Sequence, residues 1–264
     1  MSAGSERRAP RPAVMIAEEV YCLPAGANVY LIGNPSSWTL VDTSWRGALA
    51  RIREQAAALF GPGAPPQAIL ITHAHPDHVG CAVELAEAWD CPVYVPVGDL
   101  PYLSGELYSS RTDVLDPMGK ALLPAMRLVP EAARVKLNRS KLADLATPLP
   151  DDGTVPGLPG WCAVATPGHT PGHTVFVRPG DRVVIAGDAV LTAPLAGMLA
   201  RRHALSRPFW FASWNPAAMS ASYRTVAELE PRVLASGHGV PMRGDVAARL
   251  HAFAARYGSP PPSK

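Results

Sequence analysis

Four potential metal ligands lie close together in one short stretch of the chain. The segment ILITHAHPDHVG (69–80) starts as an apolar run, and His73, His75, Asp77 and His78 follow that run directly. Imidazole nitrogen and carboxylate oxygen are ligands that suit zinc, iron and manganese. One tetrahedral ion with an open position cannot use all four ligands together with histidines from elsewhere, so the pattern predicts a site for two metal ions.

The segments around this stretch predict the elements that position it. Short runs rich in Val, Ile and Tyr and bounded by turn residues are typical of strands, and they occur at 27–33, 38–42, 68–72, 93–95, 174–177 and 182–188. Apolar residues three or four apart predict helices over 49–59, 216–229 and 246–257, the second with Asn215 as N-cap. This mixture favours a layered α/β fold, in which sites usually form at the carboxyl ends of strands.

Length and pattern indicate a single domain. The 264 residues suit one large α/β unit, which we expect over 14–257. Residues 1–13 and 258–264 are polar and proline-containing and are predicted to be disordered. No strand stands out in 99–150, so we predict a partly helical insertion there.

Composition excludes several classes of protein. A formal charge of +2 gives no electrostatic signature of a nucleic-acid or anionic-membrane binder. No signal-peptide pattern is visible at the start of the sequence, and there is no run of about 18 apolar residues that would span a bilayer, so we expect a cytoplasmic protein. The four cysteines form no C-x-x-C pair and are expected to be reduced. Nothing in the sequence separates a monomer from a homodimer.

The metal-binding stretch resembles a known family signature. His73-x-His75-x-Asp77-His78 is similar to the H-x-H-x-D-H motif of the metallo-β-lactamase superfamily, and the family's other blocks have counterparts in the same order. These are VDT (41–43), which contains Asp42, TPGHTPGH (166–173), which contains His169 and His173, AGD (186–188), which contains Asp188, and SGHG (236–239), which contains His238. The resemblance runs from about residue 20 to 245. It implies a four-layer αββα sandwich with metals at one edge between the two halves.

The resemblance also implies a set of ligands. His73, His75 and His169 would hold the first metal, whereas Asp77, His78 and His238 would hold the second, with Asp188 bridging both. Because Asp188 stands where many zinc β-lactamases have Cys, the set looks like the glyoxalase II and lactonase branches. We expect His173 to be an outer partner or a substrate contact rather than a ligand, and Asp42 to be an acid behind the metal loop.

A dinuclear hydrolase of a small-molecule ester, thioester or lactone is the implied function. The cofactors would be two divalent ions, with zinc expected and iron or manganese as alternatives, and Asp77 would also hold the proton of the nucleophile. The aromatic cluster after the bridging acid either lines a substrate pocket or packs the layers; it consists of Phe209, Trp210, Phe211 and Trp214. A glutathione site would need cations such as Arg201, Arg202 and Arg207. The tyrosine that many lactonases carry after this acid is absent, since Ala189 follows.

Three alternative interpretations of the same ligand pattern have to be considered. Persulfide dioxygenases use one iron bound by two His and one Asp, but His78 and His238 fit a full dinuclear site and favour hydrolysis. A nuclease of the tRNase Z type is disfavoured by the near-neutral charge and the lack of a basic arm. A non-catalytic relic is disfavoured because all seven ligand positions are filled by suitable residues.

Overall fold

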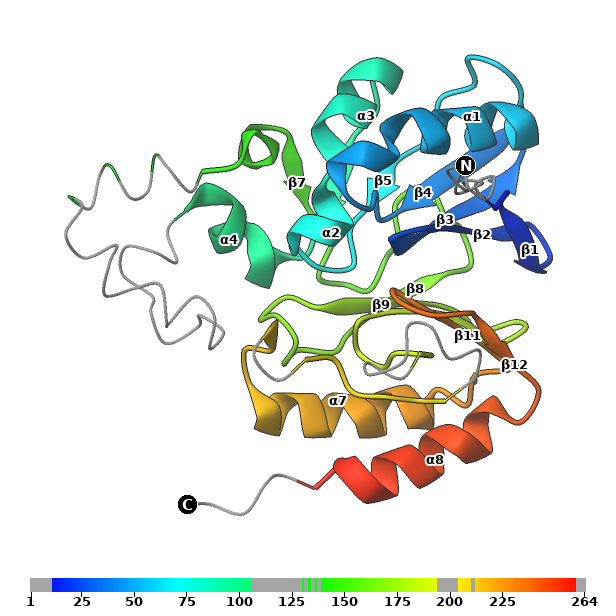
Figure 1. Cartoon of the computed structure of the whole chain (residues 1–264), viewed down its shortest axis with the longest axis vertical. Coiled ribbons are helices and arrows are strands. Elements are labelled where there is room, and N and C mark those ends of the chain that lie inside the picture. The colour runs from blue at the N-terminus through cyan, green and yellow to red at the C-terminus, as the bar shows by residue number, and fades with distance from the viewer. Residues whose placement is uncertain are drawn as a thin grey trace, which may run out of the picture.

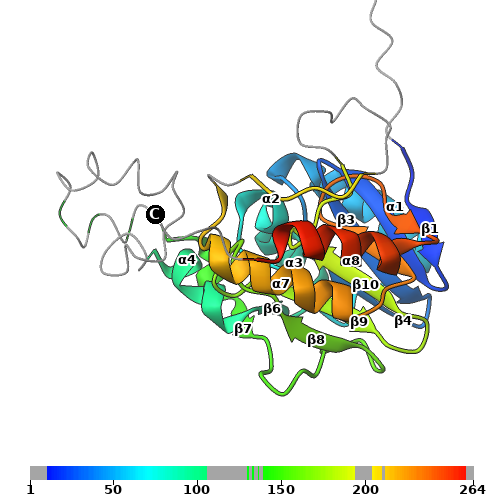
Figure 2. The same ribbon diagram turned by 90° about the horizontal axis from the view of Figure 1, so that it is seen from below.

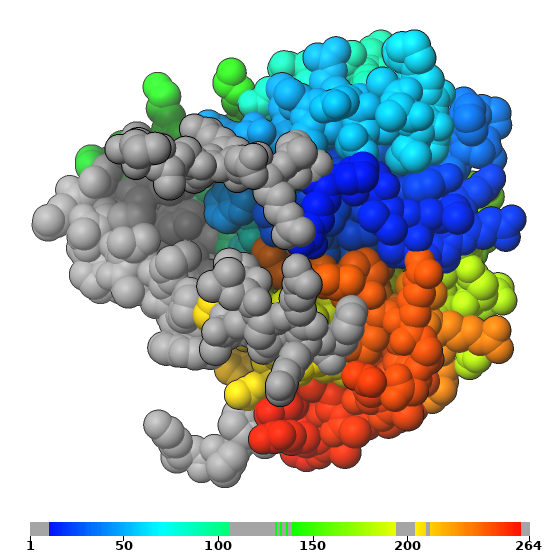
Figure 3. Space-filling model, turned by 45° about the vertical axis from the view of Figure 1, so that its right-hand side comes forward, coloured from blue at the N-terminus to red at the C-terminus, as the bar shows by residue number. Residues whose placement is uncertain are grey.

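Two β-sheets lie face to face, with helices on their outer surfaces (Figure 1). This arrangement comes from a computed structural model that describes residues 11–105, 139–193, 204–209 and 212–259, as well as residues 130, 133 and 136. The four layers confirm the predicted αββα sandwich. The N-terminal half forms one sheet with its helices and the C-terminal half forms the other, so the two halves meet along one broad interface (Figure 3).

The N-terminal sheet changes from antiparallel to parallel pairing along its width. Its seven strands lie in chain order, and β1 to β4 are antiparallel whereas β4 to β7 are parallel. The strands are β1 (Val14–Ala17), β2 (Val20–Ala25), β3 (Ala27–Asn34), β4 (Ser37–Val41), β5 (Ile69–Leu70), β6 (Val93–Val95) and β7 (Ala146–Pro148). The parallel strands β4, β5 and β6 therefore end at the same edge of the sheet.

The C-terminal sheet has five strands in the order β12-β11-β10-β9-β8. They are β8 (Cys162–Ala165), β9 (Thr174–Arg178), β10 (Val183–Gly187), β11 (Val233–Ser236) and β12 (Met242–Arg243). Only β10 and β11 pair in parallel, whereas the other neighbours are antiparallel. The residues that follow β10 and β11 consequently leave the sheet at one edge.

Helices cover both outer faces. The N-terminal half contributes η1 (Arg46–Ala48), α1 (Leu49–Phe60), α2 (Pro76–Val79), α3 (Ala82–Trp89), η2 (Val97–Asp99), α4 (Leu100–Ser104) and η5 (Lys141–Asp144). The C-terminal half contributes α7 (Pro216–Glu228) and α8 (Val246–Tyr257), which lie side by side beneath their sheet (Figures 1 and 2). The predicted cap is present, because the Asn215 side chain accepts hydrogen bonds from the backbone N–H groups of Ala217 and Ala218.

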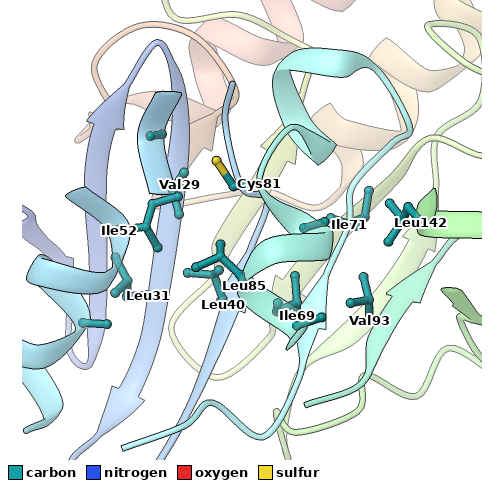
Figure 4. Close-up of a cluster of buried hydrophobic side chains, with 14 of the residues drawn as sticks. Val29, Leu31, Leu40, Ile52, Ile69, Ile71, Cys81, Leu85, Val93 and Leu142 are labelled. Carbon is teal, nitrogen blue, oxygen red and sulfur yellow. The ribbon is translucent and has the colours of Figure 1, made fainter. Parts of the chain in front are cut away.

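Alternating side chains build three apolar layers. On β3, Val29 and Leu31 pack under α1 and α3 (Figure 4), whereas Tyr30 and Ile32 face the other sheet. β10 repeats the arrangement: Val183 and Ile185 fill the space between the sheets, whereas Val184 and Ala186 pack on α7 and α8. The strands that carry site residues at their ends are thus covered on both faces.

The structure differs from the predicted domain bounds at two places. Ala146–Pro148 falls inside the insertion predicted at 99–150, yet it pairs with β6 as β7 and belongs to the sheet. Ala13 falls in the predicted disordered start, yet its backbone N–H donates to Gln55. Residues 1–10, most of 106–138 and 260–264 lie outside the described residues. The four cysteines are free, and no described helix is long and apolar enough to cross a membrane.

Candidate metal centre

Loops from both sheets bring their polar side chains to one place. His73 follows β5, His75 precedes the first turn of α2, and Asp77 and His78 lie within α2. From the other half, His169 comes from the loop between β8 and β9, Asp188 follows β10 directly, and His238 follows β11. The site is therefore assembled from the two halves at the edge where the parallel strands end.

The seven predicted ligands form three overlapping groups. In each group the potential ligand atoms lie within 4.8 Å of one another, and the groups are His73 with His75 and His169, His73 with His78 and Asp188, and Asp77 with His78 and His238. The first and third groups match the two ligand sets that the resemblance implies. The bridging acid also lies between them: Asp188 Oδ1 is 3.6 Å from His78 Nε2, and its Oδ2 is 3.4 Å from the Nε2 atoms of His169 and His238.

Several buried atoms of this cluster have no hydrogen-bond partner. They are the Nε2 atoms of His73, His78 and His169 and Oδ1 of Asp188; in the part of the chain that the structure describes, Trp38 Nε1 is the one other such atom. Buried polar atoms almost always have a partner, because burial without one costs free energy. Their grouping fits lone pairs that coordinate metal ions, and an all-nitrogen and oxygen set suits zinc, iron or manganese.

Burial and mutual proximity hold the cluster in a state suited to metal. Burial, together with the neighbouring imidazoles, lowers the pKa of His73 and His169 well below the ordinary value, so both rings are neutral. Burial opposes charge on Asp188 as well, but His238 and His78 outweigh that cost and lower the pKa of the carboxyl. Burial likewise opposes a charge on His238, yet Asp188 and Asp77 raise its pKa to about 10. Neutral imidazole and ionised carboxylate are the forms that bind metals, and a metal ion would displace the proton of His238.

Asp42 fixes the ring of His78 from behind. Its Oδ2 atom lies 2.8 Å from His78 Nδ1, and the carboxylate also accepts hydrogen bonds from the backbone N–H and hydroxyl of Thr72, each at 2.8 Å. Because Asp42 binds Nδ1, the Nε2 atom of His78 is turned toward the cluster. Asp42 thus contacts His78 and Thr72 on the side away from the other potential ligands.

His173 has both ring nitrogens engaged by the protein. Its Nε2 atom accepts a hydrogen bond from the backbone N–H of Asp188 at 3.0 Å, and its Nδ1 atom lies 2.8 Å from Thr166 Oγ1. Burial lowers the pKa of His173 to about 3, so the ring is neutral. It belongs to none of the three ligand groups. His173 therefore lies behind Asp188 and contacts its backbone N–H.

Two supporting residues carry no motif and are missed by sequence reasoning. Buried Asp99 accepts hydrogen bonds from Ala74 N (2.8 Å), Thr170 Oγ1 (2.7 Å) and Gly172 N (2.6 Å), and so it ties the His73 loop to the His169 loop. Asn28 donates from its side chain to the carbonyls of Ser236 (2.8 Å) and Gly239 (2.7 Å) on both sides of His238. Their partners lie far away in sequence, so no local pattern indicates either role.

A cavity of about 210 Å³ opens onto the cluster. Its polar side consists of His75, Asp77, His169, Asp188 and His238, and its apolar side of Leu191, Ala193, Pro208, Phe209 and Ala212. Of the predicted aromatic cluster, Phe209 lines this cavity, whereas Trp214 holds the His169 loop by a backbone hydrogen bond to the His169 carbonyl. Trp210, Phe211, Arg201 and Arg202 lie outside the described residues. Arg207 stacks on the Tyr257 ring at 4.6 Å and does not line the cavity.

Comparison with known proteins agrees with this geometry. The chain is 38% identical over 225 residues to the Bacillus subtilis (strain 168) protein named "Probable metallo-hydrolase YflN", and the match covers 83% of this chain and 82% of that protein. The solved structure of TTHA1623 in a di-iron-bound form is 27% identical, with a TM-score of 0.55 over 91% of this chain and 98% of that one. A B3 metallo-beta-lactamase with an active-site glutamic acid shares the fold, with 21% identity, a TM-score of 0.61 and coverage of 94% and 88%. A model of the metallo-beta-lactamase superfamily matches residues 23–238, and the chain belongs to that superfamily.

Proposed function

We propose that this protein is a metal-dependent hydrolase that uses a dinuclear site to cleave an ester, thioester or lactone bond of a small molecule. The observation that carries the proposal is the group of buried, unpartnered ligand atoms on His73, His78, His169 and Asp188, of which His169 and Asp188 also line a cavity. The printed name of the relative, "Probable metallo-hydrolase YflN", supports the reaction class. The di-iron form of TTHA1623 supports two ions and makes iron an alternative to the zinc that we expect.

The residues divide into two ligand sets joined by one acid. His73, His75 and His169 would hold one ion and Asp77, His78 and His238 the other, with Asp188 shared. Two divalent ions supply Lewis-acid chemistry, since they lower the pKa of a water and polarise a carbonyl oxygen. Asp77 lines the cavity, and although burial opposes its charge, His238 and His78 lower the pKa of its carboxyl. An ionised Asp77 is suited to accept the proton of the nucleophile.

Metal content is the measurement that tests this proposal. Full-length protein purified without added metal should contain about two zinc, iron or manganese ions per chain by elemental mass spectrometry, and it should hydrolyse members of a panel of esters, thioesters and lactones. Asp188→Ala should lose both metal and activity. Asp181→Ala is the matched control, because Asp181 lies in the turn before β10 and pairs with Arg178.

One alternative outcome would refute the dinuclear hydrolase. About one iron per chain, no hydrolysis of the panel, and oxygen uptake with a persulfide would indicate a mononuclear oxidoreductase instead. Two irons with ester hydrolysis would leave the proposed reaction intact and change only the metal.

A further inference from the structure

The cavity above the metal cluster has one polar side and one apolar side. The side formed by Leu191, Ala193, Pro208, Phe209 and Ala212 carries no polar side chain, and the charged or ionisable residues among the described lining all belong to the metal cluster. An apolar wall beside polar reacting groups is the usual arrangement in a site that binds an organic group next to the bond that reacts. The wall therefore faces a part of the substrate that is itself apolar.

Hydrogen bonds hold this wall in a fixed position relative to the ligands. Leu191 and Ser206 exchange backbone hydrogen bonds of 2.9 Å in both directions, so the two segments of the wall are paired. Thr192 donates its backbone N–H to the His238 carbonyl at 3.1 Å, which ties the first segment to one ligand. These hydrogen bonds thus hold the wall in place relative to the ligands.

The second segment is tied to another ligand. The Ser213 hydroxyl donates to the carbonyl of Phe209 at 2.9 Å, and the Oγ atom of Ser213 lies 3.3 Å from His169 Nδ1. The Phe209 side chain is 44% exposed although it is apolar. A large apolar side chain left this open beside a cavity gains free energy when a ligand covers it.

From these contacts we infer that the substrate carries a short, uncharged apolar group next to the scissile carbonyl, seated between Leu191 and Phe209. This inference rests on the proposed function and specifies its substrate class. A cavity of about 210 Å³ is smaller than the roughly 300–1,000 Å³ of sites for drug-sized ligands, which favours a small aliphatic group. Of the candidate cations for the carboxylates of a glutathione thioester, the one among the described residues, Arg207, stacks on Tyr257 and does not line the cavity.

Chain length is the variable that tests this substrate class. We would measure kcat/KM by pH-stat for ethyl acetate, ethyl hexanoate, hexyl acetate and a lactoylglutathione thioester. Each buried methylene favours binding by roughly fourfold, so at least one of the two esters with a six-carbon chain, ethyl hexanoate or hexyl acetate, should exceed ethyl acetate by about tenfold or more. Phe209→Ala should reduce that ratio by about threefold or more. Leu145→Ala, which removes an apolar side chain of similar exposure (41%) that does not line the cavity, should leave the ratio unchanged.

A binding experiment separates this inference from the proposed function. Hexanoate and acetate share a carboxylate, so their affinities for the metal-loaded protein by calorimetry differ only through the chain. If no ester, thioester or lactone of the panel is hydrolysed but hexanoate binds about tenfold more tightly than acetate and Phe209→Ala removes the difference, the function is wrong and the apolar site stands. Equal affinities, or preferred hydrolysis of the glutathione thioester, would overturn the apolar site.

Discussion

Asn28 should control the affinity for the metal ion that His238 helps to bind. The affinity for the other ion should be largely unaffected. Asn28 lies on β3 of the N-terminal sheet, whereas its partners Ser236 and Gly239 belong to the C-terminal half. Its amide donates to carbonyls on either side of His238, so it fixes the loop that presents this ligand. Asn28→Ala removes both side-chain hydrogen bonds but keeps the backbone hydrogen bond from residue 28 to the Gly237 carbonyl.

The cost of this substitution can be estimated from its contacts. Ser236 O keeps a second donor, the hydroxyl of Tyr30 at 2.6 Å, so it is not left without a partner. Two net hydrogen bonds of about 1 kcal/mol each then give a loss of roughly 2 kcal/mol in the free energy of unfolding. Partners that orient a metal ligand typically contribute about 10–100-fold to metal affinity. We expect a loss of that size for the ion bound by Asp77, His78 and His238.

Stepwise metal affinities decide whether this reasoning holds. Competition with a chromophoric chelator should show one weakened and one nearly unchanged dissociation constant, and urea unfolding of the metal-free protein gives the stability loss. Asn34→Ala is the matched control, since it removes an asparagine from the end of the same strand where its amide meets the exposed Glu19 carboxylate. Equal weakening of both ions, or of neither, would refute the assigned role of Asn28.

Two further predictions concern residues behind the ligands. His173→Ala should lower the free energy of unfolding by about 2–4 kcal/mol, because it leaves the buried N–H of Asp188 unpaired and opens a cavity. Elemental analysis of this variant should still find about two ions per chain. A metal content as low as in Asp188→Ala would show instead that His173 is a ligand. Burial raises the pKa of Asp99 to about 6 from an ordinary value of 3.8, so its contribution to stability is full below pH 3.8 and is lost as the pH rises through 6. The stability of the metal-free protein relative to Asp99→Asn should therefore fall by about 1 kcal/mol between pH 5 and 7.5 in urea unfolding; a constant difference would contradict the raised pKa.

Sequence reasoning recovers the elements whose signals are local. Asn215 before a proline and an apolar stripe predict the helix α7, and an uninterrupted apolar run predicts β10. Both elements are found where they are predicted. The strands β2 and β11, which lie inside the sheets, are also absent from the predicted strands. The strands β1, β7, β8 and β12 are missed because they are short and lie at sheet edges. Their side chains are partly or largely exposed, as the mixed burial of β8 (Cys162–Ala165) shows. Such strands carry little of the hydrophobic pattern from which strands are predicted.

The site follows the same division between local and distant signals. His73, His75, Asp77 and His78 are recognisable because one loop carries all four. Asn28 escapes notice because its partner Ser236 is 208 residues away, and Asp99 because its partners lie in two other loops. Residues whose role depends on tertiary contacts form no local motif that a single sequence would reveal.

The placement of ligands on both halves couples metal binding to the docking of the two sheets. The backbone N–H of Thr174 donates to the Thr72 carbonyl at 3.0 Å, joining the start of β9 to the residue before His73. Asp188 must then approach His78 from the opposite sheet, and the space for this approach depends on Gly237. A Cβ atom at Gly237 would lie 2.2 Å from Asp188 Oδ1 and 2.8 Å from His78 Cε1. A glycine is therefore required at position 237, because any side chain there would collide with Asp188. Such a side chain would separate the two ligand sets that Asp188 joins.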